Sequence, residues 1–150
     1  MSRVVCCFIS KRYLTVNQLN GNGIVMFNRA LLIGKWFRQE TSEEGDKTVE
    51  YATLTNDGQF EFNFSVYDKN DELIGENIEL GDWGLVGDIH FTITKNEVID
   101  QELFDADLTD ELNYHAYKVI KLDHQLFEYQ HIQSNEKFLM HKITDVVAYC

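Results

Sequence analysis

Residues 59–67 alternate apolar and polar side chains at every position, and this alternation constrains the fold more than any other feature. The apolar side chains at 60, 62, 64 and 66 share one face, and the polar ones between them share the other. A strict period of two is typical of a β-strand with one buried and one wet face. The dipeptide Asp57-Gly58, which precedes this strand, predicts a hairpin to an earlier strand over residues 48–55.

Short segments of this kind recur along the chain at intervals of about ten residues, which is typical of all-β barrels and sandwiches. We predict an up-and-down antiparallel β-barrel of about eight strands. The expected strands are 35–41, 48–55, 59–67, 73–80, 88–94, 114–122, 125–133 and 137–144. Glycines at 81 and 84 predict a bulge or bend. The acidic stretch 95–113 is expected to be a long connection over one barrel mouth.

Composition excludes several classes of partner. The chain has 150 residues, no proline, 13 basic and 25 acidic side chains, and a formal net charge of −12. This length indicates one domain with a substantial core. An acidic body repels phosphate backbones and anionic lipid heads, so we expect neither nucleic acid nor membrane as a partner. We expect a monomer or a homodimer.

The first 25 residues differ from the rest because they contain three basic side chains and no acidic one. We divide the chain into an extension over residues 1–25 and a barrel domain over 26–150. The extension is either disordered or dispensable, with Met26 as the true start, or it adds a strand or plugs one barrel end. Its Cys6 and Cys7, together with Cys150, are a poor disulfide framework. A cytoplasmic location is therefore expected, with the periplasm as the alternative.

Five short elements resemble small bacterial lipocalin-like proteins, within the wider group of calycins. Gly34-Lys35-Trp36 opens the first strand, and Asp57-Gly58-Gln59-Phe60 follows about twenty residues later. The last three elements come from the final strands. They are Tyr117-x-Val119-x-x-Leu122, Phe127-Glu128-Tyr129 and Phe138-x-x-His141-Lys142. The resemblance covers residues 30–144.

This resemblance implies roles for the residues that match its signature. Gly34 would open the first strand, and Trp36 would pack across the closed end of the barrel. A basic residue near the last strand stacks on that tryptophan in the family, and Lys142 is the best candidate here. The resemblance also implies a carrier of a small molecule.

The residues themselves predict a cavity, because an eight-stranded barrel has room for one small ligand. A barrel filled by its own aromatic side chains is the alternative. We expect a small apolar or amphipathic ligand. The expected cavity walls are Tyr51, Phe60, Phe62, Phe64, Trp83, Phe91, Tyr117, Phe127, Tyr129 and His131.

No motif names a reaction, so we expect no catalytic residue, no metal and no cofactor. None of the five histidines has zinc-type spacing. His131 and His141 fall on adjacent expected strands and could approach, which keeps a haem or metal site open as an alternative. Glu76, Glu79, Asp82 and Asp88 flank the bend at Trp83, where we expect solvated strand ends.

Three functions follow from this sequence, in descending order of expectation. The first is a non-catalytic carrier or sensor of a small apolar or amphipathic ligand. The second is an acidic protein-interaction or inhibitor module, which predicts a filled barrel and a basic protein partner. The third is a small haem or isomerase-type barrel enzyme, which predicts a strongly shifted pKa inside the cavity.

Overall fold

The computed structural model describes residues 18–19 and 25–144, and these are almost entirely β-strand. The barrel strands are β3 (Gly34–Thr41), β4 (Lys47–Leu54), β5 (Gln59–Tyr67), β6 (Leu73–Val86), β7 (Ile89–Ile99), β9 (Tyr114–Leu122), β10 (Leu126–His131) and β11 (Lys137–Ile143). Short elements accompany them: β1 (Gln18–Leu19), β2 (Val25–Met26), β8 (Glu102–Asp105) and the 3₁₀ turns η1 (Arg29–Leu31) and η2 (Glu111–Asn113). Most of the predicted extension, and all three cysteines, lie outside the described residues.

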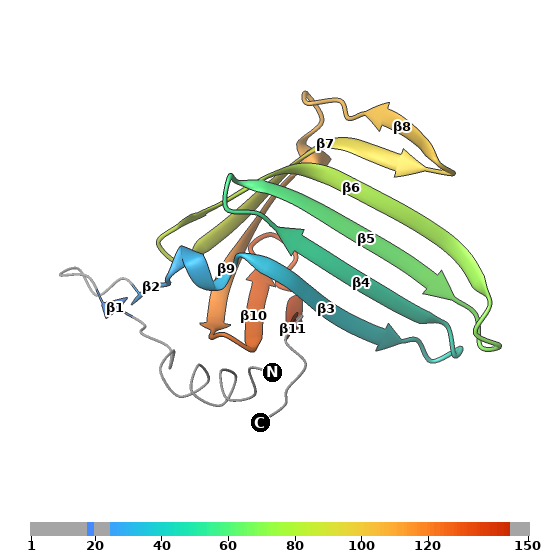
Figure 1. Ribbon diagram of the computed structural model, residues 1–150, viewed down its shortest axis with the longest axis horizontal. Helices are drawn as coiled ribbons and strands as arrows, with labels where there is room; N and C mark the ends of the chain where they lie inside the picture. The colour runs from blue at the N-terminus through green and yellow to red at the C-terminus, as the bar shows by residue number, and fades with distance from the viewer. Residues whose placement is uncertain (1–17, 20–24, 145–150) are drawn as a thin grey trace, which may run out of the picture.

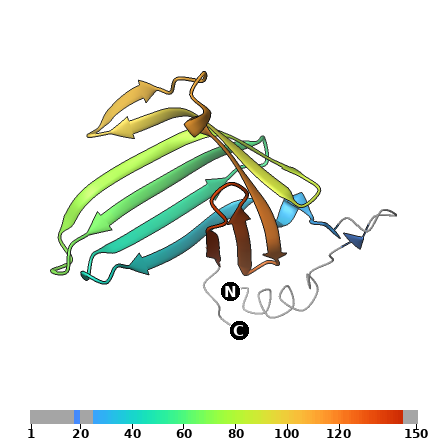
Figure 2. The same cartoon turned by 180° about the vertical axis from the view of Figure 1, so that it is seen from behind.

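The eight barrel strands form one closed antiparallel sheet. Its order is β6-β5-β4-β3-β11-β10-β9-β7, and pairing between β6 and β7 closes the ring. The predicted up-and-down barrel of eight strands is therefore confirmed. Strands β3 to β6 make a long curved sheet, and β9, β10 and β11 close it from the other side (Figures 1 and 2).

The segment 95–113 differs from the predicted long connection. Strand β7 continues to Ile99 and turns back into β8, which pairs with its last four residues. Asp100 and Gln101 make this turn with φ values of 50° and 67°, the left-handed geometry of a tight hairpin. The sequence carries no glycine at that position, so the hairpin had no recognisable signal. The predicted irregularity at Gly81 is confirmed by a register shift next to it.

One end of the barrel is closed around two tryptophans. Trp36 is fully buried, its indole N–H donates to the carbonyl of Leu32 at 2.8 Å, and the Nζ of Lys142 lies 4.5 Å from its ring centre. Trp83 donates to the Thr55 carbonyl at 3.0 Å, and the guanidinium of Arg29 covers its ring at 4.4 Å. Each indole therefore has its polar atom satisfied and a cation over its face.

Gly34 is required where β3 enters this closed end. Its φ of +128° disfavours any side chain, and a Cβ there would lie 2.7 Å from the Lys142 Nζ. That Nζ donates to the carbonyls of Ile33 and, at 3.3 Å, Leu31. A side chain at position 34 would therefore displace the lysine from its hydrogen bonds and from Trp36.

We predict that Gly34→Ala lowers the free energy of unfolding by about 2–3 kcal/mol, through backbone strain and loss of the Lys142 contacts. Urea unfolding at neutral pH measures this. Gly75→Ala is the matched control, because its Cβ would meet only Val66 at 4.0 Å. Equal effects of the two substitutions would contradict the role given to Gly34.

Candidate functional site

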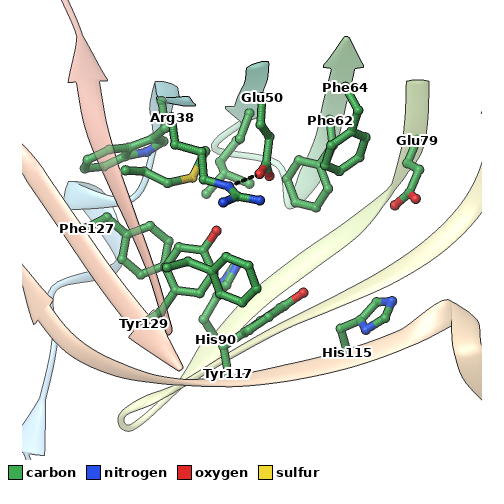
Figure 3. A pocket seen from close by; sticks show the side chains of 15 residues that line it. Arg38, Glu50, Phe62, Phe64, Glu79, His90, His115, Tyr117, Phe127 and Tyr129 are labelled. Carbon is green, nitrogen blue, oxygen red and sulfur yellow. Dashed lines mark hydrogen bonds and ion pairs between the residues drawn. The ribbon is translucent and has the colours of Figure 1, made fainter. Parts of the chain in front are cut away.

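The barrel interior holds a cavity of about 220 Å³ that opens at the end opposite the two tryptophans. Side chains from all eight barrel strands line it (Figure 3). They are Trp36, Arg38, Glu50, Ala52, Leu54, Phe62, Phe64, Glu79, His90, His115, Tyr117, Phe127, Tyr129, Phe138 and Met140.

Strand register sorts these residues by depth. Leu54 is the register partner of Gly34 at the closed end, and the next inward pair along β3 and β4 is Trp36 with Ala52. With Phe127 and Met140 these three side chains form what we call the apolar floor. Arg38 and Glu50 form the next row from the closed end, and with Glu79 and His115, which come from β6 and β9, they make up what we call the polar wall. The cavity is therefore apolar at its base and charged toward its mouth.

Arg38 and Glu50 form an ion pair on the polar wall. They are register partners on β3 and β4, and Nε of Arg38 donates to the Glu50 carboxylate. Glu50 is 7% exposed, and burial raises its pKa while the guanidinium opposes that rise. Arg38 also donates to exposed Glu40 at 2.6 Å and lies 4.8 Å from the Phe138 ring. Its charge is thus matched by two carboxylates.

His90 lies deep in the cavity wall, surrounded by aromatic rings. It is 3% exposed, with ring centres of Trp83, Tyr117 and Phe127 within 6.0 Å. Burial lowers the pKa of its imidazole to about 4, and a hydrogen bond to the Gly84 backbone opposes this only in part. A hydrogen bond raises the pKa of a histidine when a ring N–H is the donor, so the imidazole of His90 donates to the Gly84 backbone. The Nδ1 atom is buried and has no partner among the described residues, so neutral His90 presents an acceptor there.

Two tyrosines stand between the apolar floor and the mouth. Tyr117 and Tyr129 pack edge to face with ring centres 5.1 Å apart. Burial raises the pKa of both phenols, and the Glu50 carboxylate adds to the rise. Both hydroxyls therefore stay neutral and able to donate a hydrogen bond at physiological pH.

His115 and His131 form a pair at the rim. Nδ1 of His131 accepts from the backbone N–H groups of Gln133 and Ser134, at 3.3 and 3.1 Å, which places its proton on Nε2. That Nε2 lies 3.4 Å from Nδ1 of His115 and donates to it. Burial, and then the neighbouring imidazole, lower the pKa of His115. The predicted approach of His131 to His141 is wrong, because His141 pairs with Leu126 at the other end of β10.

The structure places the ten predicted wall residues in four locations. Phe62, Phe64, Tyr117, Phe127 and Tyr129 line the cavity. Phe60 and Trp83 are buried in the core of the closed end. His131 stands at the rim beside His115. Binding of a ligand by any of them remains a prediction.

The remaining two residues, Tyr51 and Phe91, lie on the outer surface of the barrel, so their predicted placement was wrong. Tyr51 is 48% exposed and packs on Phe37, with ring centres 5.2 Å apart. Phe91 covers Gly84 on the neighbouring strand, where a Cβ would lie 2.3 Å from its ring. Tyr51 is therefore accommodated on the outer face by its contact with Phe37, and Phe91 by the space that Gly84 leaves.

Sequence reasoning missed the charged and imidazole groups of the wall. Arg38, Glu50, Glu79 and His90 were not assigned to the interior, and His115 was not singled out. A signal existed for Glu50, because it shares a face with Ala52 and Leu54, both of which are small or apolar. On β7 the buried face is polar, which period-two reasoning assigns to solvent.

Within the described ranges, no group of three or more histidine, cysteine, aspartate or glutamate side chains is arranged to hold a metal ion. No helix in that part of the chain is long and apolar enough to cross a membrane.

The strand order and the open cavity define a lipocalin-like barrel, as the sequence resemblance implied. No family model and no curated protein matches the chain. Among solved structures, it is similar to a lipocalin-like protein from Bacteroides uniformis, with 17% identity and a TM-score of 0.45. That match covers 75% of this chain and 99% of the other. Likeness at this level transfers neither ligand nor mechanism.

We predict that acid selectively weakens the fold through His90. Its folded pKa of about 4 lies below the unfolded value of 6.5, so between these pH values only the unfolded chain binds the proton. Stability contributed by the neutral ring is present above pH 6.5 and is lost as pH falls, by about 2.5 kcal/mol at pH 4.5. Urea unfolding at pH 7 and 4.5 should show a loss of stability in His90→Gln that is smaller than in the wild type by about 2.5 kcal/mol. The outer-face variant His141→Gln should retain the wild-type loss, and an unchanged pH response in His90→Gln would contradict the prediction.

We predict that Arg38→Met destabilises the protein by about 3–5 kcal/mol at pH 7, because it leaves the Glu50 carboxylate buried without its partner. The double variant Arg38→Met/Glu50→Gln should recover at least half of that loss. Glu40→Gln, which removes the exposed partner, should change stability by less than about 0.5 kcal/mol. Chemical denaturation of the four proteins measures these differences. A double variant as unstable as the single one would show that Glu50 is not the cause.

Proposed function

We propose that this protein is a non-catalytic carrier or sensor of a small amphipathic molecule held inside the barrel. The observation that carries this proposal is the cavity itself, with its apolar floor below and its polar wall above. Pockets for small molecules are typically apolar with a few placed polar groups that fix orientation. The floor would supply affinity by burying apolar surface, at about 25 cal/mol per Å².

The size of the cavity limits the ligand. A volume of about 220 Å³ equals the liquid volume of about seven water molecules. One aromatic ring with a short substituent fits this space, and a larger molecule would extend through the mouth. The ligand therefore places its apolar part at the floor and its polar part at the wall.

The two other functions derived from the sequence have less support. A protein-interaction module predicts a barrel filled by its own side chains, whereas this barrel is open inside. An enzyme predicts a strongly shifted pKa in the cavity, and His90 provides one. Burial alone accounts for that shift, since no charged group contributes to it. The shift therefore follows from the packing of the ring and names no reaction.

We predict that the neutral probe 4-ethylphenol binds with a Kd of about 1 mM, as expected for a ligand of this size. Ala52→Phe should abolish binding, because residue 52 lies between Trp36 and Phe62 on the cavity wall. Thr53→Phe places the same ring on the outer face of β4 and should bind as the wild type does. Titration calorimetry measures all three proteins, with circular dichroism melts to verify folding. Equal binding to folded Ala52→Phe and to the wild type would overturn the proposed site.

A further inference from the structure

Two carboxylates face each other across β6 and β7 without a cation between them. Glu79 and Glu97 are register partners, and the charge of Glu97 contributes to raising the pKa of Glu79, after desolvation. Like charges directly opposite on neighbouring strands are destabilising. The only hydrogen bond that the described residues give Glu79 is a long one, 3.4 Å from the Thr94 hydroxyl. This wall of the cavity therefore carries uncompensated negative charge.

The nearby cations are already engaged. Arg38 is shared by Glu50 and Glu40, and Lys95 pairs with Asp82 at 2.5 Å. Within the described residues no ion pair reaches Glu79 or Glu97. The formal charge of −12 adds to the negative potential that a low-dielectric cleft focuses.

The unpaired polar atoms of this interior are acceptors. Nδ1 of His90 is one, and Oδ1 of Asn77, two residues from Glu79 on the same face of β6, is another buried atom without a partner. Acceptors of this kind are satisfied by a ligand that brings N–H or O–H donors. An ammonium group supplies donors only, together with the positive charge that Glu79 lacks.

These acceptors lie at two ends of the cavity. Figure 3 shows Glu79 on the side of His115, whereas His90 lies on the side of Phe127. Thr94, which contacts Glu79, is four residues along β7 from His90, or about 13 Å along the strand. Between the two ends stand the rings of Phe62 and Tyr117. This arrangement fits a ligand with an aromatic body and a polar group at each end.

We propose that the ligand is a protonated aromatic amine whose ammonium group pairs with Glu79 and Glu97 and whose far end donates a hydrogen bond to His90. This assignment rests on the proposed function and specifies its ligand class. Phe62, Phe64 and Tyr117 line the same cavity, and an aromatic face within about 6 Å of the ammonium adds cation–π attraction. An anionic amphiphile such as a fatty acid is disfavoured, because its carboxylate would meet the same uncompensated charge.

Four small probes, titrated by calorimetry into the full chain, separate the contacts. Tyramine carries both the ammonium and the phenol, 2-phenylethylamine lacks the phenol, 4-ethylphenol lacks the ammonium, and 3-(4-hydroxyphenyl)propionate replaces it with a carboxylate. We expect tyramine to bind at least tenfold more tightly than 4-ethylphenol and than the carboxylate. Loss of the phenol should weaken binding about fivefold.

The substitution Glu79→Gln tests the proposed ion pair between the ligand's ammonium group and Glu79. Its control is Glu61→Gln, because Glu61 is an exposed carboxylate on the outer face of β5. We expect Glu79→Gln to bind tyramine about tenfold more weakly and 4-ethylphenol unchanged, while Glu61→Gln binds both as the wild type does. Equal affinity of wild type for tyramine and 4-ethylphenol would overturn the amine assignment and leave the carrier function standing. Failure of all four probes to bind would overturn the function as well.

Discussion

Closure of the barrel depends on a short contact between its first and last strands. Strand β3 pairs with β11 through three residues, and the central pair is Trp36 opposite Lys142. The lysine lies over the indole and donates to carbonyls of the turn before β3, so one side chain joins both strands and the entering chain. Burial lowers its pKa to about 8, so it remains protonated at pH 7. Gly34 leaves the space in which this lysine lies.

This closure also sets the depth of the cavity. Trp36 blocks the interior at one end, and its ring contacts Phe127 at a centre distance of 5.6 Å. On β3 and β4 the inward residues become more polar with each step away from Gly34, from Trp36 and Ala52 to Arg38 and Glu50. Leu54, Ala52 and Glu50 show that gradient on one strand, with two residues per step. The orientation of any ligand follows from this gradient.

The sequence was enough to predict where the strands lie. It was not enough to predict which side chains of some strands face the interior of the barrel. Alternation located β5 and its inward Phe60, Phe62 and Phe64, and the Gly-x-Trp signature located the closed end. The predicted inward face was wrong on β4, where the inward face includes the charged Glu50 and the outer face the aromatic Tyr51, and on β7, where Phe91 is more apolar than the inward His90 and Thr92. Outer aromatics pair with each other or cover a glycine, and only three-dimensional pairing reveals such contacts. The polar wall was missed for the same reason.

The polar wall is better explained by a ligand than by stability. Replacing a buried ion pair with apolar side chains is often neutral or stabilising, so Arg38 and Glu50 do not hold the barrel together more effectively than a hydrocarbon pair would. Glu79 and Glu97 repel each other, and His90 holds a buried nitrogen without a partner. Each of these groups weakens the empty barrel by itself. Under the proposed function, a bound cation with a further donor would offset the repulsion of Glu79 and Glu97 and satisfy His90, which would couple the stability of this barrel to its occupancy.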